Sequence, residues 1–405
     1  HLACFDVPIT ARFCLTVLAY ERATTEDRPG WAVATGVLFG LALLTKHNSW
    51  FLPILLAVHT LCVWGLRRLA RRPAAIAPHL RALVAMLLLG PLLLYAFWPW
   101  LWRDPVARFL EYARFHLEHE YDNMEFLGQT YFQPPFPRLY APLSTLATVP
   151  LSLLALAAVA TRAHLGRVLA LVRARRAGEE PAADAALALE TPLLFLLAIG
   201  VAYVPWISSS TPIFGGTKHW MPAYPFLLLL AAEGAALAAD ALSRSWGAWR
   251  VPPLAAPLVL GAAVLSPGAI VALGSHPFGL SSYMPAVGGT AGAASLGLNR
   301  TFWGYTTQSV LDVINQETPM NGTLYLHDTA YSSFLMFREA GRLRGDIEAA
   351  RSVAEADVAV YHHEMHMAAE EYQAWVAFGT TAPRAVRGLD GVPIVWVYTR
   401  PQRAR

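Results

Sequence analysis

Eight apolar stretches follow one another along the first two thirds of the chain, and short polar segments separate them. Most of these stretches approach the ~20 residues that an α-helix needs to cross a bilayer. The pattern therefore predicts a multispanning α-helical membrane protein. The stretches lie at about 7–20, 31–45, 48–66, 80–102, 142–161, 186–207, 222–243 and 252–273.

Basic residues occur on alternate loops between these stretches. Five arginines lie within 67–81, five within 162–176, and Arg244 and Arg250 border a third loop. The positive-inside rule places these three loops in the cytoplasm. The other loops then lie outside, together with the N-terminus and everything after about residue 274. These outer loops are near 46–48, 103–141 and 208–221.

The pattern of apolar and polar residues changes after residue 273. A Gly/Ser/Pro-rich segment precedes apolar runs of strand length that alternate with helix-like stretches, which is typical of an α/β domain. The predicted strands are 323–326, 358–361 and 394–398, and the predicted helices are 330–343 and 367–377. We expect a transmembrane module over 1–273, a linker over 274–298 and a small extracytoplasmic α/β domain over 299–405.

The composition agrees with a membrane location and excludes some classes of function. Hydrophobic residues make up 55% of the 405 residues and charged residues only 15%, which is too apolar for an ordinary soluble protein. No basic stripe with interleaved aromatics occurs outside the loops, so nucleic acid is not an expected partner. Cys4, Cys14 and Cys62 fall in or beside predicted spans, where they indicate neither a disulfide framework nor a metal site.

The outer end of the first stretch carries a carboxylate, in Phe5-Asp6-Val7-Pro8. A carboxylate at this depth is costly unless it is solvated or functional, and Asp6 is therefore a candidate catalytic residue. The structural alternative is that Asp6 caps the helix, with Pro8 in its first turn. The two roles are compatible.

Two lysines lie on predicted outer loops. Lys46 stands in the hairpin between the second and third stretches, and Lys218 with His219 stands in a glycine-flexed loop that runs into the seventh. Such groups on short loops could converge on a phosphate at headgroup depth, each lysine acting as a point charge. The alternative is that the lysines only extend to the membrane interface.

The long outer loop begins with the aromatic run 98–102, which is typical of a membrane interface. Asp104 and Pro105 then predict a helix start with a side-chain cap. Apolar residues at helical spacing predict a helix that lies on the membrane surface. Its polar face carries His116, His119 and Glu120; His116 and Glu120 could bind a metal, although a solvated face is the better interpretation. The aromatic segment 123–140, with Tyr131, could line a sugar or peptide site by stacking.

Three histidines surround Glu364 in the C-terminal region, in the order His362-His363-Glu364-Met365-His366. This order lacks the two-residue spacing of a zinc-protease helix. A polar turn between a strand and a helix is the better interpretation.

Several of these segments together resemble the GT-C glycosyltransferases over about residues 1–275. They are Phe5-Asp6-Val7-Pro8, Leu44-Thr45-Lys46, the run Trp98-Pro99-Trp100-Leu101-Trp102 and the loop from Lys218 to Pro225. Within that superfamily the chain is most similar to the bacterial relatives of protein O-mannosyltransferases and lipid A aminoarabinose transferases. Lys46 matches a lysine near the carrier phosphate, and Lys218-His219 matches a position where many relatives have Arg-Tyr.

The resemblance implies inverting transfer of a mannose-like hexose or a pentose from a polyprenyl-phosphate donor to a protein, lipid or glycan hydroxyl. The enzyme would act at the outer face of the cytoplasmic (inner) membrane, would need no cofactor and could use a divalent metal. Lys46, Lys218 and His219 would stabilise the departing phosphate. The family's first outer loop carries an acidic pair that includes the base, and Asp6 matches only its second member. Because the chain begins with His1 and not with Met, we expect the base upstream, assisted by Asp6.

Two other classes of function remain open from the sequence. A transporter or lipid flippase also places polar residues near its spans, although we find no paired discontinuous helices of the inverted-repeat type. A sensor would bind its ligand in the outer α/β domain and use the spans only as an anchor. The elaborate outer loop 103–141 favours the enzyme over the sensor.

Overall fold

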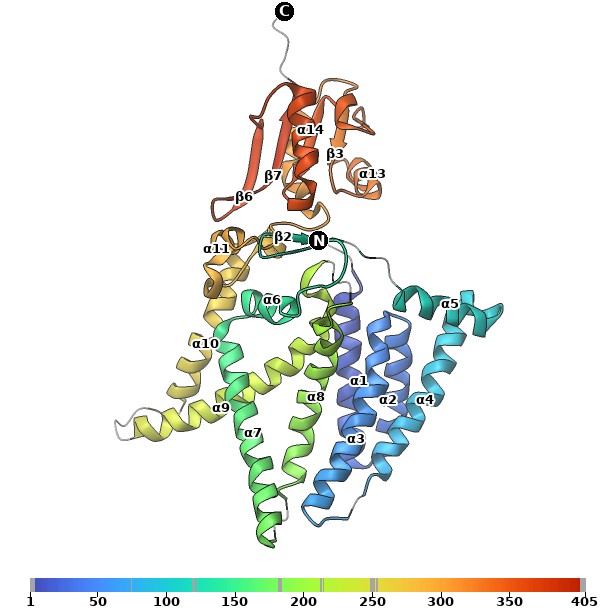
Figure 1. Cartoon of the computed structure of the whole chain (residues 1–405), viewed down its shortest axis with the longest axis vertical. Coiled ribbons are helices and arrows are strands. Elements are labelled where there is room, and N and C mark those ends of the chain that lie inside the picture. The colour runs from blue at the N-terminus through green and yellow to red at the C-terminus, as the bar shows by residue number, and fades with distance from the viewer. Residues whose placement is uncertain are drawn as a thin grey trace, which may run out of the picture.

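The computed structural model consists of a bundle of long helices beneath a small β-sheet domain (Figure 1). The structure describes all residues except 1–3, 74, 119–120, 122, 181–183, 212, 214, 248–251, 253 and 401–405. A long helix occupies most of each predicted apolar stretch. The bundle contains α1 (Asp6–Glu26), α2 (Pro29–Leu43), α3 (Phe51–Leu69), α4 (Ala77–Phe97), α7 (Leu151–Ala177), α8 (Leu187–Ile207), α9 (Tyr224–Gly247) and α10 (Ala255–Gly274).

Six helices of the described chain are long and apolar enough to cross a membrane: α3, α4, α7, α8, α9 and α10. This supports a multispanning membrane protein. The other two helices differ for identifiable reasons. Helix α1 carries Arg12, Glu21 and Arg22, and α2 has only 15 residues. The crossing of the membrane by all eight helices therefore stays a prediction.

The predicted span 142–161 is wrong in its bounds. Helix α6 (Tyr140–Thr148) ends before Val149, and α7 begins only at Leu151. The physical reason is Pro150, because the residue before a proline is driven out of the helical region; Val149 is indeed extended. Helix α6 lies across the top of the bundle, and α7 continues to Ala177, so that it includes the arginines from 162 to 176 (Figure 1).

Two of the arginine-rich segments lie at one end of the bundle, and the segments with Asp6, Lys46 and Lys218 lie at the other (Figure 1). The α3–α4 loop and the far end of α7, which hold the two clusters of five arginines, lie at the end away from the β-sheet domain (Figure 1). The start of α1, the α2–α3 turn and the loop after α8 lie at the near end. The geometry thus groups two of the three basic loops that the charge pattern groups, whereas α9 runs out to the side of the bundle and ends above the far end (Figure 1).

Small residues allow α2 and α4 to pack closely. A Cβ atom added at Gly36 would lie 2.4 Å from the carbonyl oxygen of Ala85, and one added at Gly90 would lie 2.4 Å from the ring of Phe39. Helices in lipid associate through such close packing of small residues, because lipid provides little hydrophobic drive between them.

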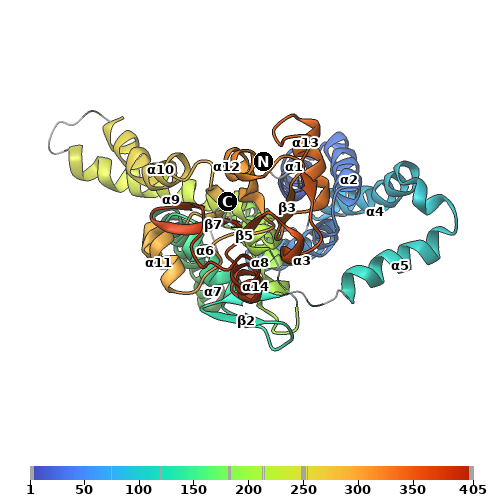
Figure 2. The ribbon, with the colours of Figure 1, turned by 90° about the horizontal axis from the view of Figure 1, so that it is seen from above.

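The long outer loop lies on the same side of the bundle as the β-sheet domain. It contains α5 (Pro105–Leu117) and a hairpin of β1 (Met124–Phe126) and β2 (Gln129–Tyr131). Seen from above, α5 extends away from the body of the molecule (Figure 2), and no side chain along its described length is buried. The predicted cap is wrong: Asp104 has a φ of 53° and makes no side-chain hydrogen bond to the helix.

Residues 274–298, expected as a linker, contain short helical segments, including α11 (Gly289–Ser295). The backbone of Gly297 accepts a hydrogen bond from the amide of Gly128 in the hairpin turn, and the Met284 amide donates to Ala147 in α6. This segment therefore connects the outer loop to the C-terminal domain.

The C-terminal domain is a five-stranded sheet in the order β4-β3-β5-β7-β6. Strands β3 and β5 are parallel, and β7 is antiparallel to β5 and β6. The three predicted strands are confirmed, and the predicted helices correspond to α13 and α14. The elements are β3 (Thr323–Leu326), β4 (Glu348–Ala349), β5 (Val358–His362), β6 (Ala385–Leu389), β7 (Val392–Thr399), α12 (Leu311–Glu317), α13 (Tyr331–Glu339) and α14 (Ala368–Phe378).

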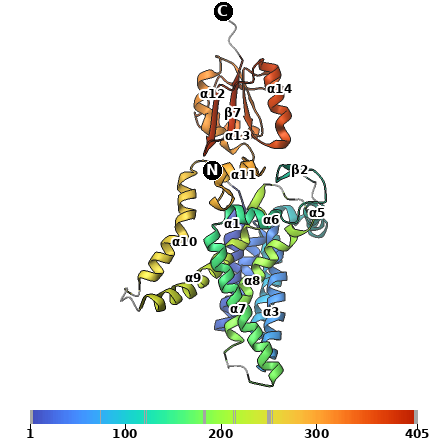
Figure 3. The same cartoon turned by 60° about the vertical axis from the view of Figure 1, so that its left-hand side comes forward.

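Both faces of this sheet are covered. Val358 and Val360 of β5 pack with α12 and α13, whereas Ala359 and Tyr361 pack with α14. This alternation follows from the two-residue period of a strand. Helices α12 and α14 accordingly lie on opposite sides of the sheet (Figure 3).

The close approach of α2 and α4 leads to a stability prediction. We expect Gly36→Ala to lower the free energy of unfolding by about 1–3 kcal/mol, because the new methyl group must push the helices apart. The matched control is Gly65→Ala in α3, where an added Cβ meets nothing within 4 Å, so the helix propensity of alanine should leave stability equal or higher. Thermal melting in detergent measures both; equal melting temperatures would show that α2 and α4 are not tightly packed.

Candidate active site

An ion pair connects the outer end of α1 to the α2–α3 turn. The Nζ of Lys46 lies 2.5 Å from Oδ1 of Asp6, and the two side chains are 22% and 10% exposed. The predicted cap is wrong here too: Phe5 occupies the cap position, Asp6 is the first helical residue, and no side chain caps the helix. The carboxylate accepts a hydrogen bond from Lys46 instead.

The second predicted lysine acts on the same carboxylate. Asp6 lies just before the apolar stretch 7–20, and its burial works against ionisation. The hydrogen bond and charge of Lys46 outweigh that burial, and together with Cys4 and the charge of Lys218 they lower the pKa of Asp6 below its ordinary value. Lys46 and Lys218 are the only lysines in the whole chain. The structure therefore brings both lysines into the electrostatic field of one carboxylate.

Backbone and ring contacts hold the loop of Lys218 against the α2–α3 turn. The buried side-chain amide of Asn48 donates a hydrogen bond of 3.2 Å to the carbonyl of His219. The ring of His219 packs on Trp206, with 4.5 Å between the ring centroids. The backbone of His219 is thus held against the turn that carries Lys46, while its function stays a prediction.

Trp303 connects Lys218 to the linker segment. The Lys218 ammonium lies 4.5 Å from the centroid of the Trp303 ring, which is a favourable cation–π geometry. Gly215 makes this approach possible, because its φ is +72° and an added Cβ would lie 2.0 Å from the indole.

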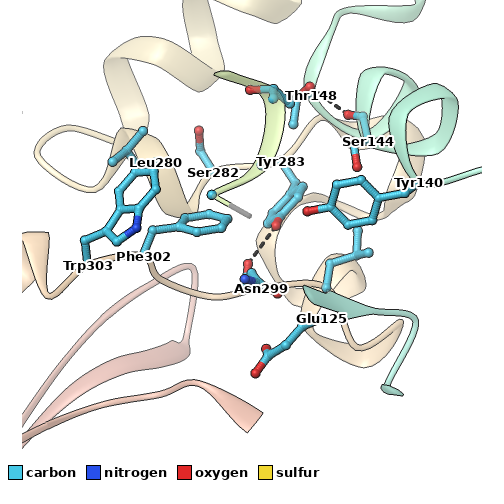
Figure 4. Close-up of a pocket in the computed structure, with 14 residues that line it drawn as sticks. Glu125, Tyr140, Ser144, Thr148, Leu280, Ser282, Tyr283, Asn299, Phe302 and Trp303 are labelled. Carbon is cyan, nitrogen blue, oxygen red and sulfur yellow. Dashed lines mark hydrogen bonds between the residues drawn. The ribbon is translucent and has the colours of Figure 1, made fainter. Parts of the chain in front are cut away.

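Trp303 also borders two adjoining cavities at the top of the bundle. The larger one has a volume of about 270 Å³, and both are lined by Tyr140, Phe302 and Asn299. Figure 4 shows Tyr140, Tyr283, Phe302 and Trp303 around the smaller cavity, and the Tyr283 hydroxyl donates to the carbonyl of Asn299. Asp6, Lys46 and Lys218 are not among the described lining of these two cavities; Lys218 reaches them only through Trp303.

A cluster of acidic and histidine side chains closes the larger cavity; sequence analysis assigned Glu364 and His366 only to a polar turn and did not identify Glu125 or Asp328. Buried Glu125 accepts two hydrogen bonds from His366, one from its amide at 2.9 Å and one from Nδ1 at 2.7 Å. Glu364 and Asp328 line the same cavity. Burial, then the charge and hydrogen bond of Asp328 and the charge of Glu125, raise the pKa of Glu364 well above its ordinary value.

One sequence signal pointed toward Glu125. The two residues between β1 and β2, Leu127 and Gly128, both have positive φ, as a two-residue hairpin turn requires. The glycine at the second position was the only local signal for this turn, because leucine is not among the residues that favour its first position, and nothing in the sequence indicated that the first strand would meet a histidine 241 positions away.

The residues predicted for a substrate loop have separate environments. The ring of His116 stacks on His47 with 4.2 Å between centroids and also contacts Tyr112, so it is packed in an aromatic cluster and is not part of a solvated face. The hydroxyl of Tyr131 donates to Gln129 at the exposed end of the hairpin. His119 and Glu120 lie outside the described residues. Asn123 and Tyr140 of the same loop line the larger cavity instead.

The segment around Glu364 is the turn between β5 and α14, as predicted. The buried ring of His362 bonds through Nδ1 to the carbonyl of His327, at 2.8 Å, and contacts Thr307. Among the described residues, no group of three or more His, Cys, Asp and Glu side chains is arranged to hold a metal ion. Whether the protein needs a metal stays open to experiment.

Comparison with known proteins provides one match. Residues 2–95 match the family model described as dolichyl-phosphate-mannose-protein mannosyltransferase. No curated protein and no solved structure matches the chain. The matched segment spans α1 to α4 and includes Asp6 and Lys46, and it indicates a glycosyltransferase of the mannosyltransferase type.

Proposed function

We propose that the protein transfers a sugar from a polyprenyl-phosphate donor to an acceptor hydroxyl at the outer face of the membrane, with inversion at the anomeric carbon. The observation that carries this proposal is the ion pair between Lys46 and the buried Asp6, at the same end of the bundle as the loop of Lys218, the only other lysine of the chain. One of those lysines and Asp6 lie within the segment that matches the mannosyltransferase family.

The lysines stabilise the leaving group. When the bond between the anomeric carbon and the phosphate oxygen breaks, the lipid phosphate gains negative charge. Lys46 and Lys218 supply compensating charge close to a low-dielectric region, where such stabilisation is strong. His219, held by Asn48 and Trp206, adds a hydrogen bond to the same phosphate.

Asp6 acts mainly by positioning Lys46. A general base works best when its pKa lies near the working pH, and the pKa of Asp6 is lowered. We therefore infer that Asp6 holds Lys46 in place and assists a second carboxylate, which takes the proton of the acceptor hydroxyl.

Replacement of Asp6 tests the positioning role. We expect Asp6→Asn to lower turnover about tenfold or more, because loss of a charge-assisted hydrogen bond of ~1.5–3 kcal/mol lets Lys46 move. Turnover should fall far more than stability, since asparagine keeps the shape and its amide oxygen can still accept a hydrogen bond from Lys46. Asp6→Glu should restore part of the turnover. The assay follows transfer from a radiolabelled polyprenyl-phosphate sugar, and wild-type turnover in Asp6→Asn would restrict Asp6 to a structural role.

A double-mutant cycle tests whether Lys46 and Lys218 share one phosphate. Each of Lys46→Met and Lys218→Met should weaken donor affinity about tenfold to a hundredfold. The combined loss should be smaller than the sum, because groups that share a partner couple. The exposed Arg103→Met is the control for loss of an outer positive charge.

The same cycle in an Asp6→Asn background separates two origins of coupling. Coupling that persists there arises from the phosphate, whereas coupling that vanishes arises from Asp6. Strictly additive losses, or losses confined to acceptor affinity, would place the phosphate site elsewhere.

Cysteine labelling tests the sidedness. In a variant without Cys4, Cys14 and Cys62, an impermeant maleimide added to intact cells should modify a cysteine at exposed Ser210 and spare one at exposed Arg72. Permeabilised cells provide the control, because both sites should then react. The reverse pattern in intact cells would overturn the orientation.

A further inference from the structure

The larger cavity lies between three parts of the chain. Asn123 and Glu125 come from the outer loop, Asn299 and Trp303 from the segment before α12, and Asp328, Glu364 and His366 from two turns of the C-terminal domain. At about 270 Å³ it lies near the lower end of the ~300–1,000 Å³ of small-molecule sites. It therefore suits a compact ligand better than an extended chain.

The lining combines flat aromatic side chains with groups that bond hydroxyls. Tyr140, Phe302 and Trp303 offer ring surfaces, and the amides of Asn123 and Asn299 lie with the carboxyl groups around them. Aromatic faces pack on the apolar faces of sugar rings; amides both donate to and accept from hydroxyl groups, and carboxylates accept from them. This set of side chains is typical of carbohydrate recognition.

Three polar atoms on residues of the lining make no hydrogen bond among the described residues: Oε1 of Glu364, Oδ2 of Asp328 and Oδ1 of Asn299. Glu364 is only 8% exposed. Figure 4 shows the Glu125 carboxylate, which borders both cavities, pointing away from Tyr140 and Tyr283. Buried polar atoms are nearly always hydrogen-bonded, so unpaired oxygens on three residues around one cavity indicate that a bound polar group completes their bonding.

The cavity is also next to the proposed donor site. The indole of Trp303 lines the cavity and contacts the Lys218 ammonium. A ligand in the cavity and a phosphate on Lys218 would therefore lie on the two sides of one side chain.

We propose that this cavity binds the acceptor, and that the acceptor is a sugar residue and not a serine or threonine side chain of a protein. The inference rests on the proposed function. In the reaction, the acceptor oxygen forms a bond to the anomeric carbon of the donor as the bond from that carbon to the phosphate oxygen breaks. The phosphate leaves with the electron pair, and a carboxylate takes the hydroxyl proton. The C-terminal domain thus forms one wall of the acceptor site.

Direct binding tests the proposal without any need for turnover. The full chain in detergent is titrated with methyl α-mannoside, methyl β-glucoside and an acetylated Ser/Thr tetrapeptide amide, and binding is followed by saturation-transfer NMR. We expect at least one glycoside to bind and the peptide not to bind. Binding of the peptide alone, or of no glycoside, would overturn the proposal.

Variants locate the binding. We expect Trp303→Leu and Glu364→Ala each to weaken glycoside affinity about tenfold or more, whereas Glu364→Gln, which can still donate and accept, should retain most of it. The matched controls Glu348→Ala and Tyr372→Leu replace exposed side chains on β4 and α14, and they should bind like the wild type. Unchanged affinity in both cavity variants would show that the glycoside binds elsewhere.

A separate variant keeps the two proposals apart. Lys46→Met should weaken donor affinity about tenfold to a hundredfold and leave glycoside binding unchanged. If the wild type fails to use a polyprenyl-phosphate donor and yet binds glycosides through Trp303 and Glu364, the proposed function is wrong and the carbohydrate site stands. If the wild type transfers sugar to the peptide and does not bind glycosides, the proposed function is supported and the carbohydrate site is wrong.

Discussion

The contact between Lys46 and Asp6 fixes the outer end of the helix bundle. It connects the first residue of α1 to the turn that joins α2 and α3, at a depth where neither charge is well solvated. A buried charge is tolerated only when it is paired. The start of α1 and the end of α2 must therefore lie side by side. The neighbouring bond from Asn48 to the His219 carbonyl brings the loop after α8 to the same place. The candidate site is therefore a consequence of where these helices end.

The C-terminal domain completes the outer face through contacts of a different kind. Met124, Phe126, Phe136 and Trp220 form an apolar cluster that holds the outer loop against the ends of α6 and α8. From this rigid base, Glu125 bonds to His366 and so links the loop to the turn before α14. Removal of the domain would open the larger cavity, because Asp328, Glu364 and His366 would leave its wall.

Local and periodic features of the fold could be predicted from the sequence, and long-range ones could not. Runs such as 358–361 marked the strands because apolar β-branched residues suit a sheet buried on both faces. Asp6, Lys46 and Lys218 could be grouped because charge placed all three on one side of the membrane. The cap expected at Asp6 failed because its carboxylate bonds to a lysine 40 positions away. Glu125 and Trp303 were missed, and Glu364 was assigned only to a turn, because their roles depend on how the C-terminal domain sits on the bundle.

The choice of lysine at the site has a physical consequence. The chain has 31 lysine and arginine residues, and only Lys46 and Lys218 are lysines. An arginine at position 46 would donate two parallel hydrogen bonds to the Asp6 carboxylate. Its planar guanidinium would then be fixed in the plane of that carboxylate. The ammonium of Lys46 has three donors that point in different directions, and one bond to Asp6 leaves the others able to reach a second anion. Lysine can therefore be held by a carboxylate and still bind a phosphate, which is what a site that must stabilise a departing charge requires.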